Sequence, residues 1–328
     1  MTQLPIDLFC WWLIIFNKMS SIKSKLLLIF ICFFSLTSQG QKSESPIVCS
    51  GKVDRLVSFP SKFISSRNID IWLPKNYSPQ QKYAVLYMHD GQMLFDANKT
   101  WNKQEWGVDE TLTKLFANKD IKKCIVVGIW NTPNRHSEYF PQKPFNSLPK
   151  AYKDSLLNKA LKYGNQKLFS KRVCSDNYLK FIVTELKPYI DKHYNVKKDS
   201  SNTFIGGSSM GGLISMYALF EYPSVFGGVI CMSTHWLGTH QIKNNPIPIA
   251  FANYIEKNIR KLNTHKLYFD YDTETLDQIY EPYQKMINKV LKDKKYKHFK
   301  SKKFKGHNHS ENSWKMRLAI PFKFLLKK

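Results

Sequence analysis

The side chains best placed for chemistry lie in residues 203–213, Thr-Phe-Ile-Gly-Gly-Ser-Ser-Met-Gly-Gly-Leu. They contain the pattern G-x-S-x-G, with Ser209 at its centre, between a strand-like apolar run and a helical segment. A nucleophile on so sharp a turn needs small neighbours, because Cβ atoms at Gly207 and Gly211 would collide with the backbone. The turn also points the Met210 amide toward a developing oxyanion. The pattern alone occurs by chance, but its position favours a serine nucleophile over a structural glycine-rich turn.

A serine nucleophile requires a base, because the hydroxyl is weak at its ordinary pKa. On a strand–turn–helix site of this kind the chain order is serine, acid, histidine, so the base is expected late. Residues 306–311 supply His307 and His309, for which a pair of surface histidines is the alternative interpretation. His235 precedes every acid candidate, so we expect it, with Trp236, to line the substrate pocket.

The acid is expected after the strand-like run 267–269, where four carboxylates occur within eight residues: Asp270, Asp272, Glu274 and Asp277. Aspartate or glutamate can stabilise an imidazolium, so residue type leaves the choice open. The second oxyanion donor is expected from the turn after an early central strand, where Gly91 or Gln92 follows His89 and Asp90.

Apolar runs of strand length alternate with helical patterns along the chain. Residues 69–73 end at a proline and predict an edge strand. The nearly continuous runs are typical of strands buried on both faces of a parallel sheet and lie at 83–88, 124–130, 203–205, 229–232 and 267–269, with a more exposed run at 297–304. Within 177–191 the apolar residues share one helical face. This alternation predicts a three-layer α/β fold with a mostly parallel sheet, in one domain over residues 41–328.

Residues 141–170 interrupt this pattern. They are polar, rich in lysine and too long for an ordinary connection, so we expect a helical or irregular cap insertion over a site.

The composition excludes several protein classes. The chain has 328 residues, 43% of them hydrophobic, which excludes intrinsic disorder. No run of about 18 uncharged apolar residues occurs, which excludes a multi-spanning membrane protein. No C-x-x-C pair, metal-ligand cluster or cofactor fingerprint appears, so we expect no metal and no cofactor. Four cysteines follow residue 40, and their spacing specifies no disulfide: Cys49, Cys124, Cys174 and Cys231.

The amino terminus predicts export. The apolar stretch 26–34 follows Lys23 and Lys25 and precedes small and polar residues, as in a secretory signal peptide. We expect residues 1–40 to be an export segment with its true start at Met19, and the protein to be periplasmic or secreted. The alternative is an uncleaved signal anchor that also uses the stretch 8–16. Membrane contact is expected only through this segment.

The net charge of +25 has two explanations. A coding bias toward lysine, asparagine and isoleucine would produce this positive charge without any functional role. Attraction to an acidic partner, such as an anionic polysaccharide, is the functional explanation. Residues 292–305 interleave lysines with aromatic side chains, as in a nucleic-acid-binding strand. An ordinary half-exposed last strand explains them better, so no nucleic-acid partner is expected.

Four segments resemble the putative esterase family of α/β-hydrolases, which includes esterase D, enterochelin-type siderophore esterases, feruloyl and acetyl-xylan esterases, and mycolyltransferases. The resemblance spans residues 67–314. It rests on the opening strand R-x-h-x-h-W-L-P at 67–74, on His-Asp-Gly-Gln at 89–92, on Gly-Gly-Ser-Ser-Met-Gly-Gly at 206–212, and on G-x-x-H-S-E at 306–311.

The resemblance implies roles for particular residues. It makes His309 the base, and it makes Arg135, Glu138 and Tyr139 the R-x-x-E-Y loop that positions substrate. The family has Gly-Thr and then an acid where this chain has Asp272-Thr273-Glu274-Thr275. By that alignment Glu274 is the first choice for the acid, with Asp277 and then Asp272 as alternatives.

Together these features predict an exported serine carboxylesterase that works through an acyl-enzyme. Its substrate would be a small-molecule or polysaccharide ester, such as an acyl or feruloyl ester, or a siderophore lactone. The alternatives are an acyltransferase on the same scaffold and a non-catalytic binding protein on a hydrolase fold. Which ester is cleaved and the oligomeric state are not specified by the sequence.

Overall fold

The computed structural model describes residues 44–161, 167–170 and 172–328. The expected export segment 1–40, with Met19, lies outside the described residues, so export stays a prediction. Residues 45–328 form one compact unit. Among the described residues, no helix combines the length and apolar character needed to cross a membrane.

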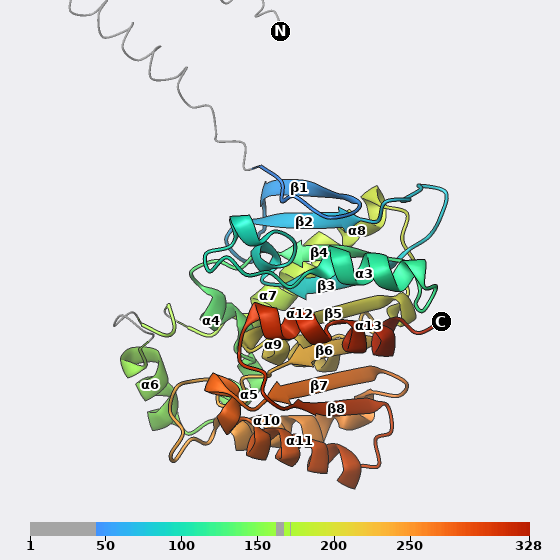
Figure 1. Ribbon diagram of the computed structural model, residues 1–328. Coiled ribbons are helices and arrows are strands. Elements are labelled where there is room, and N and C mark those ends of the chain that lie inside the picture. Colours follow the sequence, from blue (N-terminus) through green and yellow to red (C-terminus); the bar gives the residue numbers. More distant parts are fainter. Residues whose placement is uncertain (1–43, 162–166, 171) are drawn as a thin grey trace, which may run out of the picture. The chain divides into compact units, whose positions relative to one another are not determined.

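An eight-stranded sheet runs through this unit (Figure 1). The spatial order is β1-β2-β4-β3-β5-β6-β7-β8, and only the β1–β2 and β2–β4 pairs are antiparallel. The strands are β1 (Lys52–Phe59), β2 (Arg67–Leu73), β3 (Ala84–His89), β4 (Cys124–Ile129), β5 (Thr203–Ser208), β6 (Gly228–Met232), β7 (Lys266–Asp272) and β8 (Phe299–Phe304). The predicted mostly parallel α/β sheet is confirmed.

Helices cover both faces of the sheet (Figure 1). One face packs against α3 (Val108–Ala117), α12 (Glu311–Arg317) and α13 (Ala319–Leu326). The other packs against α7 (Ser175–Phe181), α8 (Lys187–His193), α9 (Met210–Glu221), α10 (Ile247–Asn258) and α11 (Glu281–Asp293). A π-helical turn at Ile182–Leu186 joins α7 to α8, so the predicted helix at 177–191 is one continuous helical segment. Short 3₁₀ turns occupy Gly91–Met93, Ala97–Lys99, Ser200–Asn202, Ile259–Lys261 and Thr275–Ile279.

The predicted edge position of residues 69–73 is wrong. β2 lies between β1 and β4, and β1 forms the edge of the sheet. The side chains of β1 are half-buried or exposed, so its sequence has no continuous apolar run to mark it as a strand. An antiparallel hairpin therefore covers the strand that the proline at residue 74 marks as an edge.

The expected cap segment, 141–170, contains α5 (Gln142–Asn146) and α6 (Lys150–Lys159) and follows α4 (Arg135–Tyr139). Its apolar side chains Phe145, Leu148 and Phe169 are buried in the same core as α9 and α10. The described part of the segment is thus anchored to the domain, and its role as a lid stays a prediction.

The carboxyl ends of the central parallel strands lie at one edge of the sheet, where sites of α/β proteins form. β5 ends directly before Ser209, β7 ends at Asp272 and β3 ends before Asp90. The turn after β3 crosses the backbone of β4 closely, since a Cβ at Gly91 would lie 2.4 Å from the Gly128 carbonyl carbon. Only glycine fits there, which fixes how this turn approaches the site.

Candidate active site

Ser209 occupies a strained turn between β5 and α9. Its φ of 57° and ψ of −120° are unfavourable for a residue with a side chain. The backbone is held on both sides: the Ser209 amide donates to the Met232 carbonyl at 2.9 Å, and its carbonyl accepts from the His235 amide at 3.2 Å. A Cβ at Gly207 would lie 3.0 Å from the Gly211 backbone, which confirms the predicted close approach.

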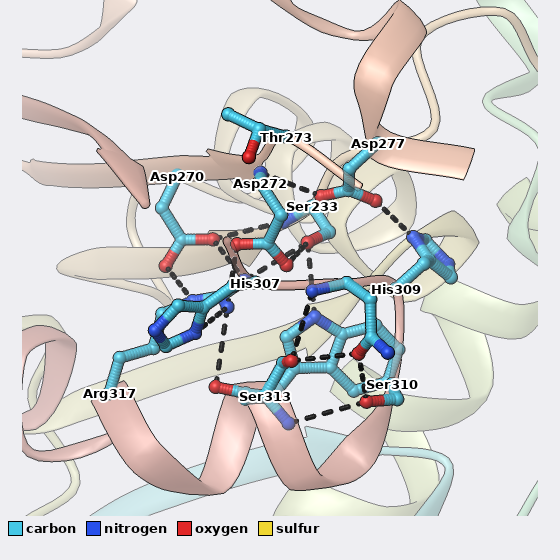
Figure 2. Close-up of polar contacts among 12 residues, drawn as sticks. Ser233, Asp270, Asp272, Thr273, Asp277, His307, His309, Ser310, Ser313 and Arg317 are labelled. Atoms are coloured by element: carbon cyan, nitrogen blue, oxygen red, sulfur yellow. Dashed lines mark hydrogen bonds and ion pairs between the residues drawn. The ribbon is translucent and has the colours of Figure 1, made fainter. Parts of the chain in front are cut away.

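His309 follows β8 and is fixed by Asp277. Its Nδ1 is hydrogen-bonded to Asp277 Oδ1 (Figure 2). Its backbone amide donates to Thr275 Oγ1 at 2.9 Å. Asp277 is fully buried, and its second oxygen accepts from the Asp272 amide at 2.9 Å. The imidazole packs edge-on between two aromatic rings, with centroids 5.1 Å from Trp314 and 5.9 Å from Tyr280. The ring is therefore held with Nδ1 on the carboxylate and Nε2 available.

Ser209 and His309 line the same cavity, whose volume is about 620 Å³. Its lining comes from the turns after β3 and β4, from residues 101–106 and from the start of α12. The remaining lining residues are Asp90, Gln92, Met93, Trp101, Asn102, Gln104, Trp106, Asn131, Arg135, Ser208, Ser310, Glu311 and Trp314. No described residue of the 141–170 segment lines this cavity.

The first choice for the acid, Glu274, is wrong. Its side chain is exposed and accepts a hydrogen bond from the Thr273 hydroxyl at 3.1 Å. Thr275 has a φ of 53° and begins a 3₁₀ turn that carries Asp277 back beneath the end of β7. Asp277, the second choice, therefore occupies the position at the imidazole, while the third choice, Asp272, reaches it only through its backbone amide.

Two neighbouring carboxyl groups have opposite pKa shifts. Burial acts to raise the pKa of Asp277, but the hydrogen bond and charge of His309 outweigh it, so the pKa lies below its ordinary value. Burial, opposed by Arg317 and reinforced by Asp277 and Asp270, raises the pKa of Asp272 to about 7. Below about pH 7 the carboxyl group that stays ionised is thus the one that faces the histidine.

A buried arginine holds the two loops of the site together (Figure 2). Arg317, on α12, is 2% exposed and contacts Asp270 at 3.1 Å and Asp272 at 2.7 Å. It also donates to Ser233 Oγ at 3.0 Å, and the same oxygen accepts from Trp314 Nε1 at 3.0 Å. The end of β7, the turn after β6 and the helix after His309 are joined in one network.

Sequence reasoning missed Arg317, although a signal was present. Arginine is rare in this lysine-rich chain. Most of the arginines pair with carboxylates that are nine-tenths or more buried, as in Arg55–Asp70, Arg67–Glu138, Arg135–Asp90 and Arg317–Asp270. Because the guanidinium suits buried two-point pairing better than an ammonium does, the few arginines mark structural ion pairs.

Of the predicted R-x-x-E-Y loop, only Arg135 lines the cavity. It contacts the Asp90 carboxylate at 2.7 and 2.8 Å. Glu138 is 2% exposed and pairs with Arg67 at 2.8 and 2.9 Å. Tyr139 is fully buried, and its hydroxyl accepts from the Asp90 amide at 3.4 Å. The expectation that Glu138 and Tyr139 contact substrate is therefore wrong: they support the loop from inside.

Trp236 does not line the cavity either. It is 1% exposed, and its indole nitrogen donates to Gln284 Oε1 at 2.9 Å within the core. His235 is buried behind Ser209 rather than in the cavity wall. Short alternating sequences do not distinguish a pocket wall from a core position, because the difference arises only when α10 and α11 pack.

Two of the three expected oxyanion donors lie at the nucleophile or in its cavity. Met210 is the first residue of α9, directly after Ser209. Gln92 lines the cavity, and its side-chain oxygen accepts from the Asn131 amide at 3.1 Å. Gly91 is buried just before it. These positions are compatible with the predicted pair of backbone donors.

One group of side chains could hold a metal ion. Cys49, Asp109 and Glu110 place one ligand atom each within 4.8 Å of one another. None of them lines the cavity at Ser209, and Lys315 already contacts Glu110 at 3.1 Å. The group was not found from the sequence because Cys49 is distant in the chain from the two carboxylates.

Comparison with known proteins shows which family the chain matches. The family model described as "Putative esterase" matches residues 61–320, which confirms the resemblance inferred from the motifs. The uncharacterized protein YbbA of Bacillus subtilis (strain 168) is 28% identical over 173 residues. That match covers 52% of this chain and 58% of the relative, so the chain spans little more than half of that relative's length.

Two solved structures share the fold. Enterochelin esterase from Shigella flexneri has a TM-score of 0.60 and 14% identity, over 84% of this chain and 60% of that one. The ferulic acid esterase AmCE1/Fae1A from Anaeromyces mucronatus has a TM-score of 0.57 and 18% identity, over 88% of this chain and 92% of that one.

The raised pKa of Asp272 predicts a pH-dependent stability difference. The folded protein keeps a proton on Asp272 up to about pH 7, whereas the unfolded chain releases it near its ordinary pKa. Between these values the folded state binds more protons, so this contribution to stability falls as pH rises. Asp272→Asn removes the titration. The stability of this variant relative to the parent, measured as the difference between their free energies of unfolding in urea, should increase from pH 5 to pH 8. Glu274→Gln is the control, and a pH-independent difference for Asp272→Asn would contradict the assignment.

Proposed function

We propose that this chain, which belongs to the putative esterase family, is a carboxylic ester hydrolase with a serine mechanism. Ser209 is the nucleophile, His309 the general base and Asp277 the acid that orients it. The observation that carries the proposal is the shared cavity: a serine on a strained turn and a histidine paired to a buried carboxylate both open into it. The chain order serine, acid, histidine agrees with this type of site.

The reaction follows from these positions. Ser209 Oγ attacks the acyl carbon, and its proton moves to His309 Nε2 while Asp277 stabilises the imidazolium. The amides of Met210 and of Gly91 or Gln92 donate to the oxyanion. His309 then gives the proton to the leaving alcohol. Water attacks the acyl-enzyme by the same route in reverse, which releases the acid and restores Ser209.

Carbohydrate-linked acyl esters are the proposed substrate class. Trp101 lines the cavity and is 84% exposed, next to the amide side chains of Asn102 and Gln104. An exposed indole with amides beside it suits stacking on the apolar face of a sugar ring. The fold shared with a ferulic acid esterase supports this class, and the fold shared with an enterochelin esterase makes a siderophore lactone the alternative.

Replacing the nucleophile tests the mechanism. Ser209→Ala should lower kcat for p-nitrophenyl acetate on the order of 10⁶-fold, because the oxygen that carries the acyl group is removed from the turn that His309 faces. The thermal unfolding midpoint should stay close to that of the parent, which controls for folding. Turnover equal to the parent's would remove Ser209 from the mechanism. Transfer of the acyl group to an added sugar, rather than to water, would identify an acyltransferase.

A matched pair of variants tests the acid. Asp277→Asn should lower kcat by about 10⁴-fold, because the amide no longer stabilises the imidazolium or fixes its tautomer. Glu274→Gln changes a nearby exposed carboxylate in the same way and should leave kcat unchanged. Equal losses in both variants, or a loss confined to Glu274→Gln, would contradict the assignment.

Trp101 allows a test of the substrate class. Trp101→Ala should raise KM for a feruloylated or acetylated oligosaccharide about tenfold, the scale of one lost aromatic contact, and leave p-nitrophenyl acetate unaffected. Trp101→Phe keeps a ring and should retain most of the affinity. Equal effects on both substrates would argue against a sugar contact, and hydrolysis of a catecholate lactone alone would replace the proposed class.

A further inference from the structure

Tyr280 lies among the groups that carry out the reaction, although no motif marks it. It is fully buried, one residue beyond the 3₁₀ turn that carries Asp277. Its hydroxyl is 2.5 Å from His235 Nδ1, and it lies close enough to the Ser209 side chain for that side chain to act on the pKa of the phenol. Its ring meets the ring of His309 edge-on, at 84°. One tyrosine thus contacts the base and a second histidine and lies beside the nucleophile.

Backbone contacts hold this arrangement in place. The Tyr280 amide donates to the Asp277 carbonyl at 2.9 Å. The His235 amide donates to the Ser209 carbonyl at 3.2 Å. Tyr280 also packs in a small apolar cluster with Leu237 and Tyr271. Both partners of the phenol–imidazole pair are therefore tied to the residues proposed for catalysis, and the contact is not a chance approach of mobile side chains.

Burial fixes the charge state of the pair. It raises the pKa of Tyr280 well above its ordinary value, so the phenol keeps its proton. Burial, with the charges of nearby histidines, lowers the pKa of His235 well below its ordinary value, so the imidazole is neutral. The neutral phenol and the neutral imidazole each have one hydrogen-bond donor, so the arrangement is defined by which group donates to which.

That direction follows from what Ser209 must do. The serine hydroxyl has one proton, and in the productive state it donates that proton to His309. It can then only accept from Tyr280, so the phenol must donate to Ser209 Oγ. The phenol oxygen in turn accepts from His235, which requires the tautomer with the proton on Nδ1. In the opposite arrangement Tyr280 donates to His235 and draws the serine proton away from the base.

We propose that Tyr280 is a further catalytic residue, a hydrogen-bond donor to Ser209 Oγ, and that His235 is the positioning residue that orients it. The proposal rests on the proposed function of Ser209 and His309. Donation to Oγ does not help the attack, because it reduces nucleophilicity. It helps the step in which Oγ leaves.

That step is the breakdown of the second tetrahedral intermediate. Water has bonded to the acyl carbon, and its proton is on His309 Nε2. The bond from the acyl carbon to Oγ breaks, its electron pair goes to Oγ, and His309 returns the proton there. The Tyr280 hydroxyl stabilises the negative charge that develops on Oγ before that proton arrives. Deacylation, rather than acylation, therefore depends on the phenol.

Tyr280→Phe separates these two steps. With p-nitrophenyl acetate we expect kcat to fall about tenfold, as for one lost hydrogen bond, and KM to fall with it, while kcat/KM is retained. A burst of p-nitrophenol equal to the enzyme concentration should appear, since the acyl-enzyme accumulates. Tyr271→Phe, in the same apolar cluster, is the matched control and should behave as the parent. Loss of kcat/KM without a burst would indicate a merely structural role and overturn the proposal, as would unchanged kinetics.

Two variants at His235 test the positioning role. His235→Leu leaves the phenol oxygen without its donor, and deacylation should slow as in Tyr280→Phe. His235→Asn places an amide donor near the former Nδ1 and should restore most of the rate. Equal rates in the two variants would contradict the role. A fully active Ser209→Ala would instead refute the underlying mechanism, whereas an inactive Ser209→Ala with a normal Tyr280→Phe would refute only this inference.

Discussion

The backbone of Ser209 is the constraint on which the rest of the site depends. A φ of 57° with a ψ of −120° is held only because the surrounding structure leaves no alternative. Both peptide groups of the turn are paired, α9 is buried along nearly its whole length, and the Gly207–Gly211 contact excludes side chains. The strain is therefore sustained by packing. In return, the serine oxygen occupies a fixed position toward which the loops after β3, β7 and β8 converge.

Charge pairing at the end of β7 decides which carboxylate serves the histidine. Asp270 and Asp272 share the single positive charge of Arg317 in a buried network, in which Asp272 keeps a proton up to about pH 7. Asp277 has no guanidinium in its described contacts and faces the imidazole, so its charge stabilises a cation only there. Arg317, which does not line the cavity, thus leaves Asp277 as the carboxylate paired with the imidazole, in the position of the proposed acid. The same guanidinium joins the strand of the acid to the helix that follows the base.

The sequence was sufficient to predict those parts of the fold and the site that depend on residue spacing and chain order. The placement of Ser209 and His309 in one cavity could be predicted, because a sharp turn needs glycines and because the histidine follows the last strand. The carboxylate that pairs with His309 could not be predicted, since its position depends on the positive φ of Thr275, which the residue type does not indicate. Strand β1 could not be predicted either, because it lacks an apolar run. The core position of Trp236 could not be predicted, because a tryptophan suits a pocket wall as well as a core. The parallel sheet was predictable from buried runs, whereas the long-range ion pairs were not.

The proposed mechanism requires Ser209 to be the activated hydroxyl of the cavity. Reaction of the intact protein with a fluorophosphonate, followed by mass spectrometry of the peptides, measures this without knowledge of the natural substrate. We predict one adduct per chain, on Ser209, that is lost when His309 is replaced by alanine or when the protein is unfolded beforehand. Absence of an adduct on the folded protein, or an adduct that is unaffected by loss of His309, would contradict the account.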